Sequence, residues 1–146
     1  MAKAISFDTE LLNHIFNNAA IAGIGDTNGV QPSAGAGSLY LAMHTADPTA
    51  AGNQSSSEIS YTGYARISIA RSSAGFVVSG ASVTLAANAD FGEMTGGTGG
   101  TVTFFSVGKA ASGATNILYS GAVSPSIAIA TGVTPRLKLA TSITES

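Results

Sequence analysis

The sequence contains no cysteine and no tryptophan, and it is poor in charged residues. The lack of cysteine excludes disulfide bonds and thiolate metal sites, and it leaves the redox compartment open. Charged residues make up 10% of the chain, against about 25% in an average globular protein. Because the formal net charge is only −2, we expect no electrostatic attraction to nucleic acid.

Long hydrophobic runs are also missing. No apolar run reaches the ~20 residues that a membrane-spanning helix requires, so we expect no membrane partner. The first residues lack the apolar core of a signal peptide, which predicts synthesis in a cytoplasm without export. A length of 146 residues suits one domain, residues 1–146, that buries roughly two-thirds of its unfolded surface.

The polar residues that are present are mainly Ser, Thr, Asn and Gly. A surface with few charges loses little hydration free energy when it is covered, so it suits a protein packed into an assembly. The same composition also fits a hydroxyl-rich β protein that is simply soluble. Composition alone does not separate these two interpretations.

Residues 8–20 have the spacing of an amphipathic helix. Ser6 or Asp8 can accept hydrogen bonds from its first free N–H groups. A helix of about three turns is marginal alone in water. It must therefore pack on the sheet of its own domain or on a neighbouring subunit. The apolar stripe follows i, i+3, i+4 spacing and comprises Leu11, Leu12, Ile15, Phe16 and Ala19.

The stretch from Ser38 to His44 alternates in the manner of a strand with one face in a core. Its inward side chains are Leu39, Leu41 and Met43, and the opposite face carries the residues between them. Asp47 and Pro48 then end the strand, because proline lacks a donor and restricts the residue before it.

The rest of the chain, within residues 38–143, is predicted to consist of short strands separated by Gly, Ser and Pro. In residues 64–70 the alternation places Ile67 and Ile69 on one face and Arg66 on the other. Near the carboxyl end, Leu137, Leu139 and Ile143 are the candidates for the core. The expected strands are 64–70, 75–79, 81–85, 101–108, 116–120, 126–130 and 134–143.

This pattern predicts a mainly β fold, an antiparallel β-sandwich or jelly-roll-like domain with one N-terminal α-helix. Three stretches rich in glycine or small polar residues are predicted to be surface loops. They are residues 22–37, 45–60 and 92–100.

Two loops contain residues that superficially fit a metal or nucleophile site. Asp26 opens a run similar to a calcium loop, but the remaining ligands are missing. His44 and Asp47 could orient a serine nucleophile, yet no Gly-x-Ser-x-Gly elbow follows a strand. We instead expect Asp47 to accept local N–H groups in a turn. With His14 the only other histidine, a three-histidine metal site is impossible within one chain.

Two further patterns bear on catalysis. Asp90 and Glu93 could act as a carboxylate pair, but the aromatic floor of a sugar cleft is missing. The glycine run 96–100 lacks the lysine and the following helix of a phosphate loop. We therefore predict no catalytic residue, no metal site and no cofactor, which means that the protein is not an enzyme.

Five collinear segments carry a family resemblance: Leu11–Phe16, Leu39–Pro48, Ser60–Arg66, Thr103–Gly108 and Asn116–Val123. Together they span roughly residues 9–140, and they resemble a family of small tailed-bacteriophage virion structural proteins. Relatives in that family are often labelled tail-fibre-like, and similar small β-sandwich proteins act as capsid cement. The resemblance implies a protein of the virion that is made in the host cytoplasm.

The leading hypothesis from sequence is a capsid decoration protein that binds the outside of the major capsid lattice and stabilises the shell. Its expected partners are the major capsid protein and further copies of itself, as a homodimer or homotrimer. The alternative is a tail, baseplate or tail-fibre-associated protein, including one that binds host glycans. An exposed aromatic patch would favour glycan binding, and its candidates are Tyr40, Tyr61, Tyr64 and Tyr119.

Overall fold

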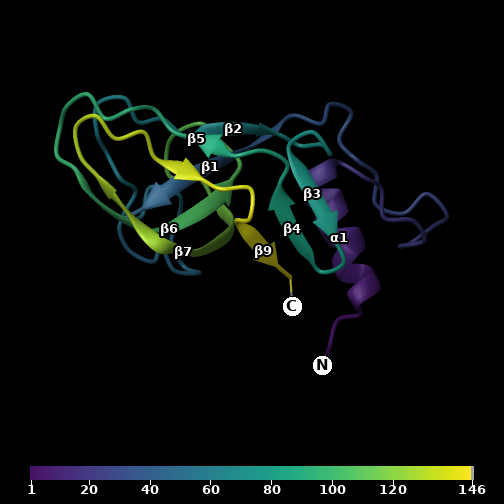
Figure 1. The fold of residues 1–146 in the computed structure, drawn as a ribbon. Coiled ribbons are helices and arrows are strands. Elements are labelled where there is room, and N and C mark those ends of the chain that lie inside the picture. Colours follow the sequence, from purple (N-terminus) through teal and green to yellow (C-terminus); the bar gives the residue numbers. More distant parts are fainter. Residues whose placement is uncertain (146) are drawn as a thin grey trace. The chain divides into compact units, whose positions relative to one another are not determined.

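The protein is described by a computed structural model that covers residues 1–145 (Figure 1). As predicted, it is mainly β, with antiparallel sheets and one N-terminal helix, α1 (Ile5–Asn17). The strands are β1 (Ser38–His44), β2 (Ile67–Ala70), β3 (Phe76–Ser79), β4 (Ser82–Leu85), β5 (Ala89–Asp90), β6 (Gly100–Gly108), β7 (Ile117–Ile129), β8 (Arg136–Leu137) and β9 (Ser142–Thr144).

The strands form three sheets, with the orders β2-β1-β6-β7, β3-β4-β9 and β5-β8. The chain divides into two compact units. The helical unit comprises Met1–Ser38, Ile69–Ala87 and the chain from Lys138 onward. The sheet unit comprises Leu39–Ser68 and Asn88–Leu137.

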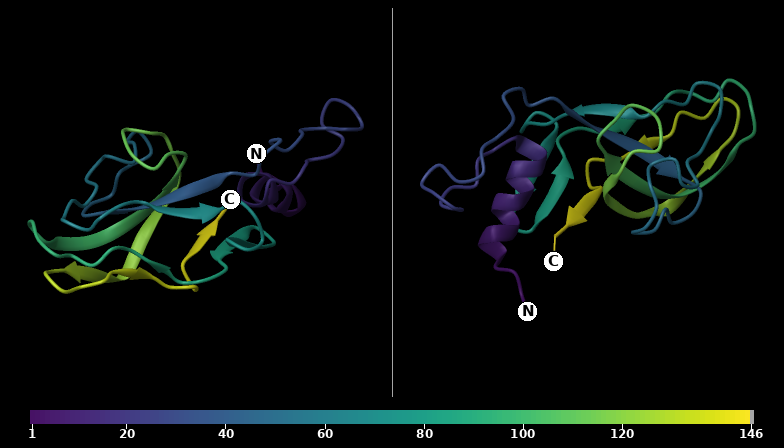
Figure 2. Two further views of the ribbon diagram at one scale, coloured as in Figure 1. Left: turned by 90° about the horizontal axis from the view of Figure 1, so that it is seen from above. Right: turned by 180° about the vertical axis from the view of Figure 1, so that it is seen from behind.

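In the helical unit, α1 packs against β3 and β4 (Figures 1 and 2). Leu12 and Phe16 are fully buried on this side of the helix. The ring of Phe16 meets Phe76 of β3 edge to face, with 4.9 Å between the ring centroids. Packing against strands of its own unit gives this short helix the support that it lacks in water.

The helix begins and ends three residues earlier than the sequence pattern predicted. Asp8 lies in its first turn rather than at its cap, and Asp8 Oδ1 is 3.0 Å from Lys3 Nζ. A carboxylate in this position is favoured by the helix dipole. At the other end, Asn18 adopts a left-handed conformation, with φ of 53°. Arg71 donates hydrogen bonds to the carbonyl groups of His14 and Ile15, which satisfies the last turn.

In the sheet unit, β6 is a central strand between β1 and β7. Leu41 pairs with Val107, and Met43 pairs with Phe105. The prediction that only one face of β1 is buried was wrong, because Ala42 and His44 are also fully buried. The segment after β1 folds back over this second face, since Ile59 N–H donates to the carbonyl of Met43.

Three other strand predictions were wrong in detail. The strand expected at 64–70 begins only at Ile67, and Arg66 is buried rather than exposed. The strands expected at 116–120 and 126–130 form the single strand β7. The segment expected at 134–143 contains two short strands, and Leu139 is 50% exposed between them.

The one helix in residues 1–145 does not have the length and apolar character that crossing a membrane requires.

We predict that Phe16→Ala destabilises the protein by about 3–5 kcal/mol, because it removes a fully buried ring and leaves a cavity against Phe76. Ile5→Ala is the matched control in the same helix, since Ile5 is 70% exposed. Chemical denaturation measures both variants. A loss of similar size in the two variants would contradict the packing described for α1.

Candidate functional site

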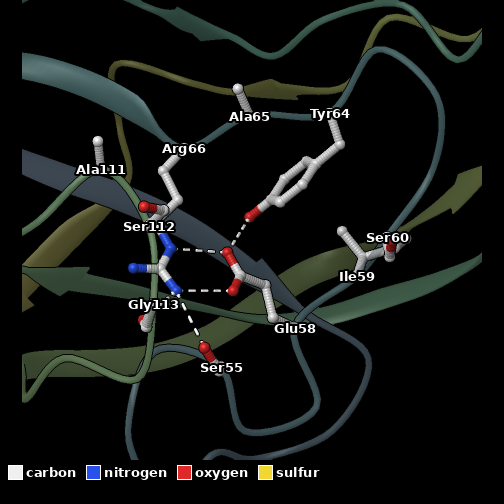
Figure 3. A pocket seen from close by; sticks show the side chains of 10 residues that line it. All are labelled: Ser55, Glu58, Ile59, Ser60, Tyr64, Ala65, Arg66, Ala111, Ser112 and Gly113. Atoms are coloured by element: carbon white, nitrogen blue, oxygen red, sulfur yellow. Dashed lines mark hydrogen bonds and ion pairs between the residues drawn. The ribbon is translucent and has the colours of Figure 1, made fainter.

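The sheet unit contains an open pocket with a volume of about 450 Å³ (Figure 3). Its walls come from the segment that leads from β1 to β2 and from the turn between β6 and β7. The lining residues are Ser55, Glu58, Ile59, Ser60, Tyr64, Ala65, Arg66, Ala111, Ser112 and Gly113.

A buried ion pair forms the base of this pocket. Arg66 Nε and Nη2 each donate to a different oxygen of Glu58, both at 2.7 Å. The side chains are only 2% and 16% exposed, so little solvent screens the pair. The hydrogen bond from Arg66 to Glu58 raises the pKa of the guanidinium. The guanidinium therefore stays charged, and the bidentate geometry of the pair favours arginine over lysine.

Tyr64 provides a further hydrogen bond to the carboxylate of this ion pair. Its hydroxyl donates to Glu58 Oε1 at 2.8 Å and accepts from Met43 N–H at 3.2 Å. Burial of the phenol raises the pKa of Tyr64 well above its usual value. Tyr64 thus remains neutral and serves as a hydrogen-bond donor to Glu58.

Arg66 also joins two loops through the rest of its guanidinium. Nη1 donates to Gln54 Oε1 and to the carbonyl of Ala110, at 3.3 and 3.2 Å. Nη2 donates to the carbonyl of Gly113 at 2.9 Å. All five N–H groups therefore have acceptors within the protein, and none remains to bind an anionic ligand.

Gln54 is fully buried and links the pocket to the sheet. Its amide Nε2 donates to the carbonyl of Tyr40 at 2.9 Å, and its Oε1 accepts from the hydroxyl of Thr115 at 3.0 Å. The amide lies against Gly108 of β6, where a Cβ atom would be 2.1 Å from Gln54 Cδ. Glycine at this position is what allows the loop to lie close to the strand.

His44 and Ser106 form a second buried polar contact, beneath the loop and outside the pocket lining. His44 Nδ1 is 2.8 Å from the carbonyl of Ser56, and Nε2 is 2.7 Å from Ser106 Oγ. These partners assign the proton to Nδ1, so Nε2 accepts from the serine hydroxyl. The hydrogen bonds from serine to histidine and from histidine to a carbonyl oxygen resemble those around the nucleophile of a serine hydrolase. However, His44 and Ser106 are both 0% exposed. The contact therefore joins β1, β6 and the loop, and a substrate has no access to it.

The structure does not bring His44 and Asp47 together as a catalytic pair. The exposed Asp47 instead accepts a hydrogen bond from Thr49 N–H at 2.8 Å, as expected of a turn residue. Asp26 likewise accepts from the N–H groups of Asn28 and Gly29. In residues 1–145, no three or more His, Asp or Glu side chains are grouped so that they could hold a metal ion.

Asp90 and Glu93, for which no catalytic role was predicted, lie on the surface. Asp90 forms an exposed ion pair with Arg136 on the neighbouring strand β8. The hydrogen bond from Arg136 lowers the pKa of Asp90. The glycine run 96–100 is fixed to the segment before β2, because the carbonyl of Gly96 accepts a hydrogen bond from Thr62 N–H at 2.9 Å.

Two of the four tyrosines considered for an aromatic patch lie inside the sheet unit. Tyr61 is buried, and its hydroxyl donates to the carbonyl of Gly92 at 2.8 Å. Its ring lies 5.4 Å from Tyr64, which in turn stacks on Phe91 at 6.0 Å. Tyr61 is thus buried and Tyr64 is half-buried at the pocket wall, so their stack does not provide an exposed platform for a sugar ring.

The network of Gln54, Glu58, Tyr64 and Arg66 was not predicted from the sequence. One signal was available, because a chain with so few charged residues places Glu58 and Arg66 close together beside an apolar strand. Burying an unpaired charge in such surroundings costs free energy, so an ion pair between Glu58 and Arg66 could have been expected.

Comparison with known proteins gave one family. The sequence model described as Podophage GP4 fiber I protein gp80 matches residues 4–144. No curated protein matches the chain.

We predict that Arg66→Met destabilises the protein by about 3–5 kcal/mol, because Glu58 would remain as a buried charge without its partner. Arg136→Met is the matched control, since its ion pair with Asp90 is solvent-exposed and contributes little. Urea denaturation compares the two variants. Equal losses of stability in the two variants would show that burial does not determine how much the ion pair of Arg66 contributes to the free energy of unfolding.

We also predict that stability falls as the pH is lowered below about 6.5. Burial lowers the pKa of His44 in the folded protein, whereas the unfolded chain binds a proton near the ordinary value of 6.5. The unfolded state therefore takes up more protons, at a cost of at most about 1.4 kcal/mol per pH unit. Urea midpoints between pH 7 and 5 measure the slope, and His44→Asn should flatten it. An unchanged slope in that variant would exclude His44 as the cause.

Proposed function

The chain belongs to the Podophage GP4 fiber I protein gp80 family, and on that premise we propose that it is a non-enzymatic structural component of a phage tail-fibre assembly. A role in the virion as a structural protein follows from the family. The single observation that carries the finer proposal is the family description, which matches residues 4–144 and so includes nearly the whole chain. This favours the alternative hypothesis of the sequence analysis over capsid decoration.

The geometry of the pocket supports a mechanical role. All N–H groups of the Arg66 guanidinium donate to acceptors of the protein itself, which are Glu58, Gln54, Ser55 and two backbone carbonyls. The guanidinium therefore fixes the loops that carry these acceptors and does not bind a ligand. Buried ionic contacts of this kind lock loop conformations into one arrangement, which is useful in a component that transmits force. Because the sequence has no repeat of fixed period, we assign it to a globular part of the assembly rather than to a repeating shaft.

Capsid decoration is the second candidate. The low content of charged residues favours it, since a surface with few charges is cheap to desolvate over a repeated lattice. Weak contacts to the major capsid protein would then be strengthened by multivalent attachment. The same surface property serves contacts within a fibre assembly, so the location in the particle distinguishes the two candidates.

We predict that antibodies against this protein label the tail region of intact virions in immunogold electron microscopy. Quantitative mass spectrometry of purified particles should find few copies relative to the major capsid protein. Label spread over the capsid, with copies in the hundreds, would replace the fibre assignment with capsid decoration. Absence from purified particles would contradict both candidates.

A further inference from the structure

The pocket above the buried ion pair keeps one hydrogen-bond acceptor that the protein itself does not use. Glu58 Oε1 accepts from Tyr64 and from Arg66 Nε, whereas Oε2 accepts only from Arg66 Nη2 (Figure 3). A carboxylate offers about four acceptor sites, so one site is left on Oε2. The side chain of Glu58 is 16% exposed and lines the pocket, which places this acceptor within reach of a small molecule.

Three serine hydroxyls line the same pocket. They belong to Ser55, Ser60 and Ser112, and all three residues are exposed. Within residues 1–145, the hydroxyls of Ser60 and Ser112 form no hydrogen bond, and that of Ser55 accepts one from Arg66 at 3.4 Å. Because each hydroxyl both donates and accepts, the pocket offers hydrogen bonds of both kinds to a ligand.

The charges of the pocket favour a neutral ligand. Among the lining residues only Glu58 and Arg66 are charged, and they neutralise each other. An anion would meet the carboxylate and would find no free N–H on the guanidinium, since all five N–H groups have acceptors. A cation that approached Glu58 would be repelled by the neighbouring guanidinium. A neutral molecule that donates to Glu58 Oε2 avoids both costs.

We propose that this pocket binds a neutral saccharide. One sugar hydroxyl donates to Glu58 Oε2, and adjacent hydroxyls exchange hydrogen bonds with Ser60 and Ser112. The C–H groups of the ring lie against Ala65 and Ala111, two small exposed apolar residues of the lining. The pocket volume of about 450 Å³ is within the range of about 300–1,000 Å³ that is typical of small-ligand sites.

The site is also formed before the ligand arrives. Three hydrogen bonds from Tyr64 and Arg66 hold the Glu58 carboxylate in one position, so little conformational entropy is lost when a sugar hydroxyl binds to it. Arg66 joins both walls of the pocket through Gln54 and the carbonyl groups of Ala110 and Gly113. Binding through this carboxylate needs no exposed aromatic platform, because the contacts are hydrogen bonds.

NMR titration of the full chain with methyl glycosides of glucose, galactose and mannose tests the proposal. We expect saturable shifts of the amide signals of Ser60 and Ser112 with at least one of these neutral sugars. Galacturonic acid is the charged counterpart of galactose and should cause no such shifts, because its carboxylate would face Glu58. Stronger shifts with the acid than with the neutral sugars would overturn the proposal.

Two tryptophan variants test whether the sugar occupies this pocket. Ala111→Trp should abolish the shifts, since an indole at this exposed lining position fills the space above Glu58. Ala51→Trp is the matched control, because Ala51 is an exposed alanine of the same unit outside the lining. Binding that survives Ala111→Trp, or that is lost equally in both variants, would exclude this pocket as the site.

Alanine variants of the serines test the hydrogen bonds directly. Ser60→Ala and Ser112→Ala should each weaken binding by about 3- to 10-fold, which is the effect of losing one neutral hydrogen bond. Ser126→Ala, at an exposed serine outside the pocket, should leave the affinity unchanged. Unchanged affinity in both pocket variants would contradict the proposed contacts.

A glycan array distinguishes a free sugar from a glycan of a surface. Retention of neutral oligosaccharides by the wild type, but not by Ala111→Trp, would identify the ligand as the end of a glycan chain. Binding of the methyl glycosides without retention on the array would identify it as a free sugar, and either result supports the proposal. The absence of both would overturn it.

Discussion

The ion pair between Arg66 and Glu58 is the constraint on which the sheet unit depends. A guanidinium with a side-chain exposure of 2% is tolerated only if every donor has an acceptor, and the surrounding backbone is shaped to provide them. The turn at 110–113 and the segment at 54–58 are both held by this one side chain. Gln54 then carries the network down to the strands, where Gly108 makes space for it.

Scarce charges are used in the same way elsewhere in the chain. Arg71 caps the last turn of α1 by donating to backbone carbonyls, and Lys3 joins Asp8 and Glu145 within the helical unit. The basic residues with such internal bonds are Lys3, Arg66 and Arg71, whereas Arg136 forms an exposed ion pair with Asp90. The chain has few other charged residues, so its polar side chains are mainly those of Ser, Thr and Asn. That composition suits a protein whose family belongs to the phage virion.

The sequence predicted those features that depend on local patterns. The bounds of β1 and the turn at Asp47 were predicted correctly, because alternation and Asp-Pro chemistry are read from neighbouring residues. The interior position of Arg66 was not, since alternation treats charged residues as solvent-facing and does not consider a distant partner. The contact between His44 and Ser106 spans 62 positions, so no local pattern could indicate it. The helix was predicted to lie three residues too late, and Arg71, which bonds its last carbonyl groups, is 56 and 57 positions away in the sequence from Ile15 and His14.

The division of the chain has a consequence for synthesis on the ribosome. The sheet unit is encoded between Leu39 and Leu137, whereas the helical unit needs β9, which pairs with β4 from Ser142–Thr144. During translation from the amino end, all strands of the sheet unit therefore emerge before β9 does. Helix α1 therefore emerges well before β9, the strand that completes the sheet against which it packs.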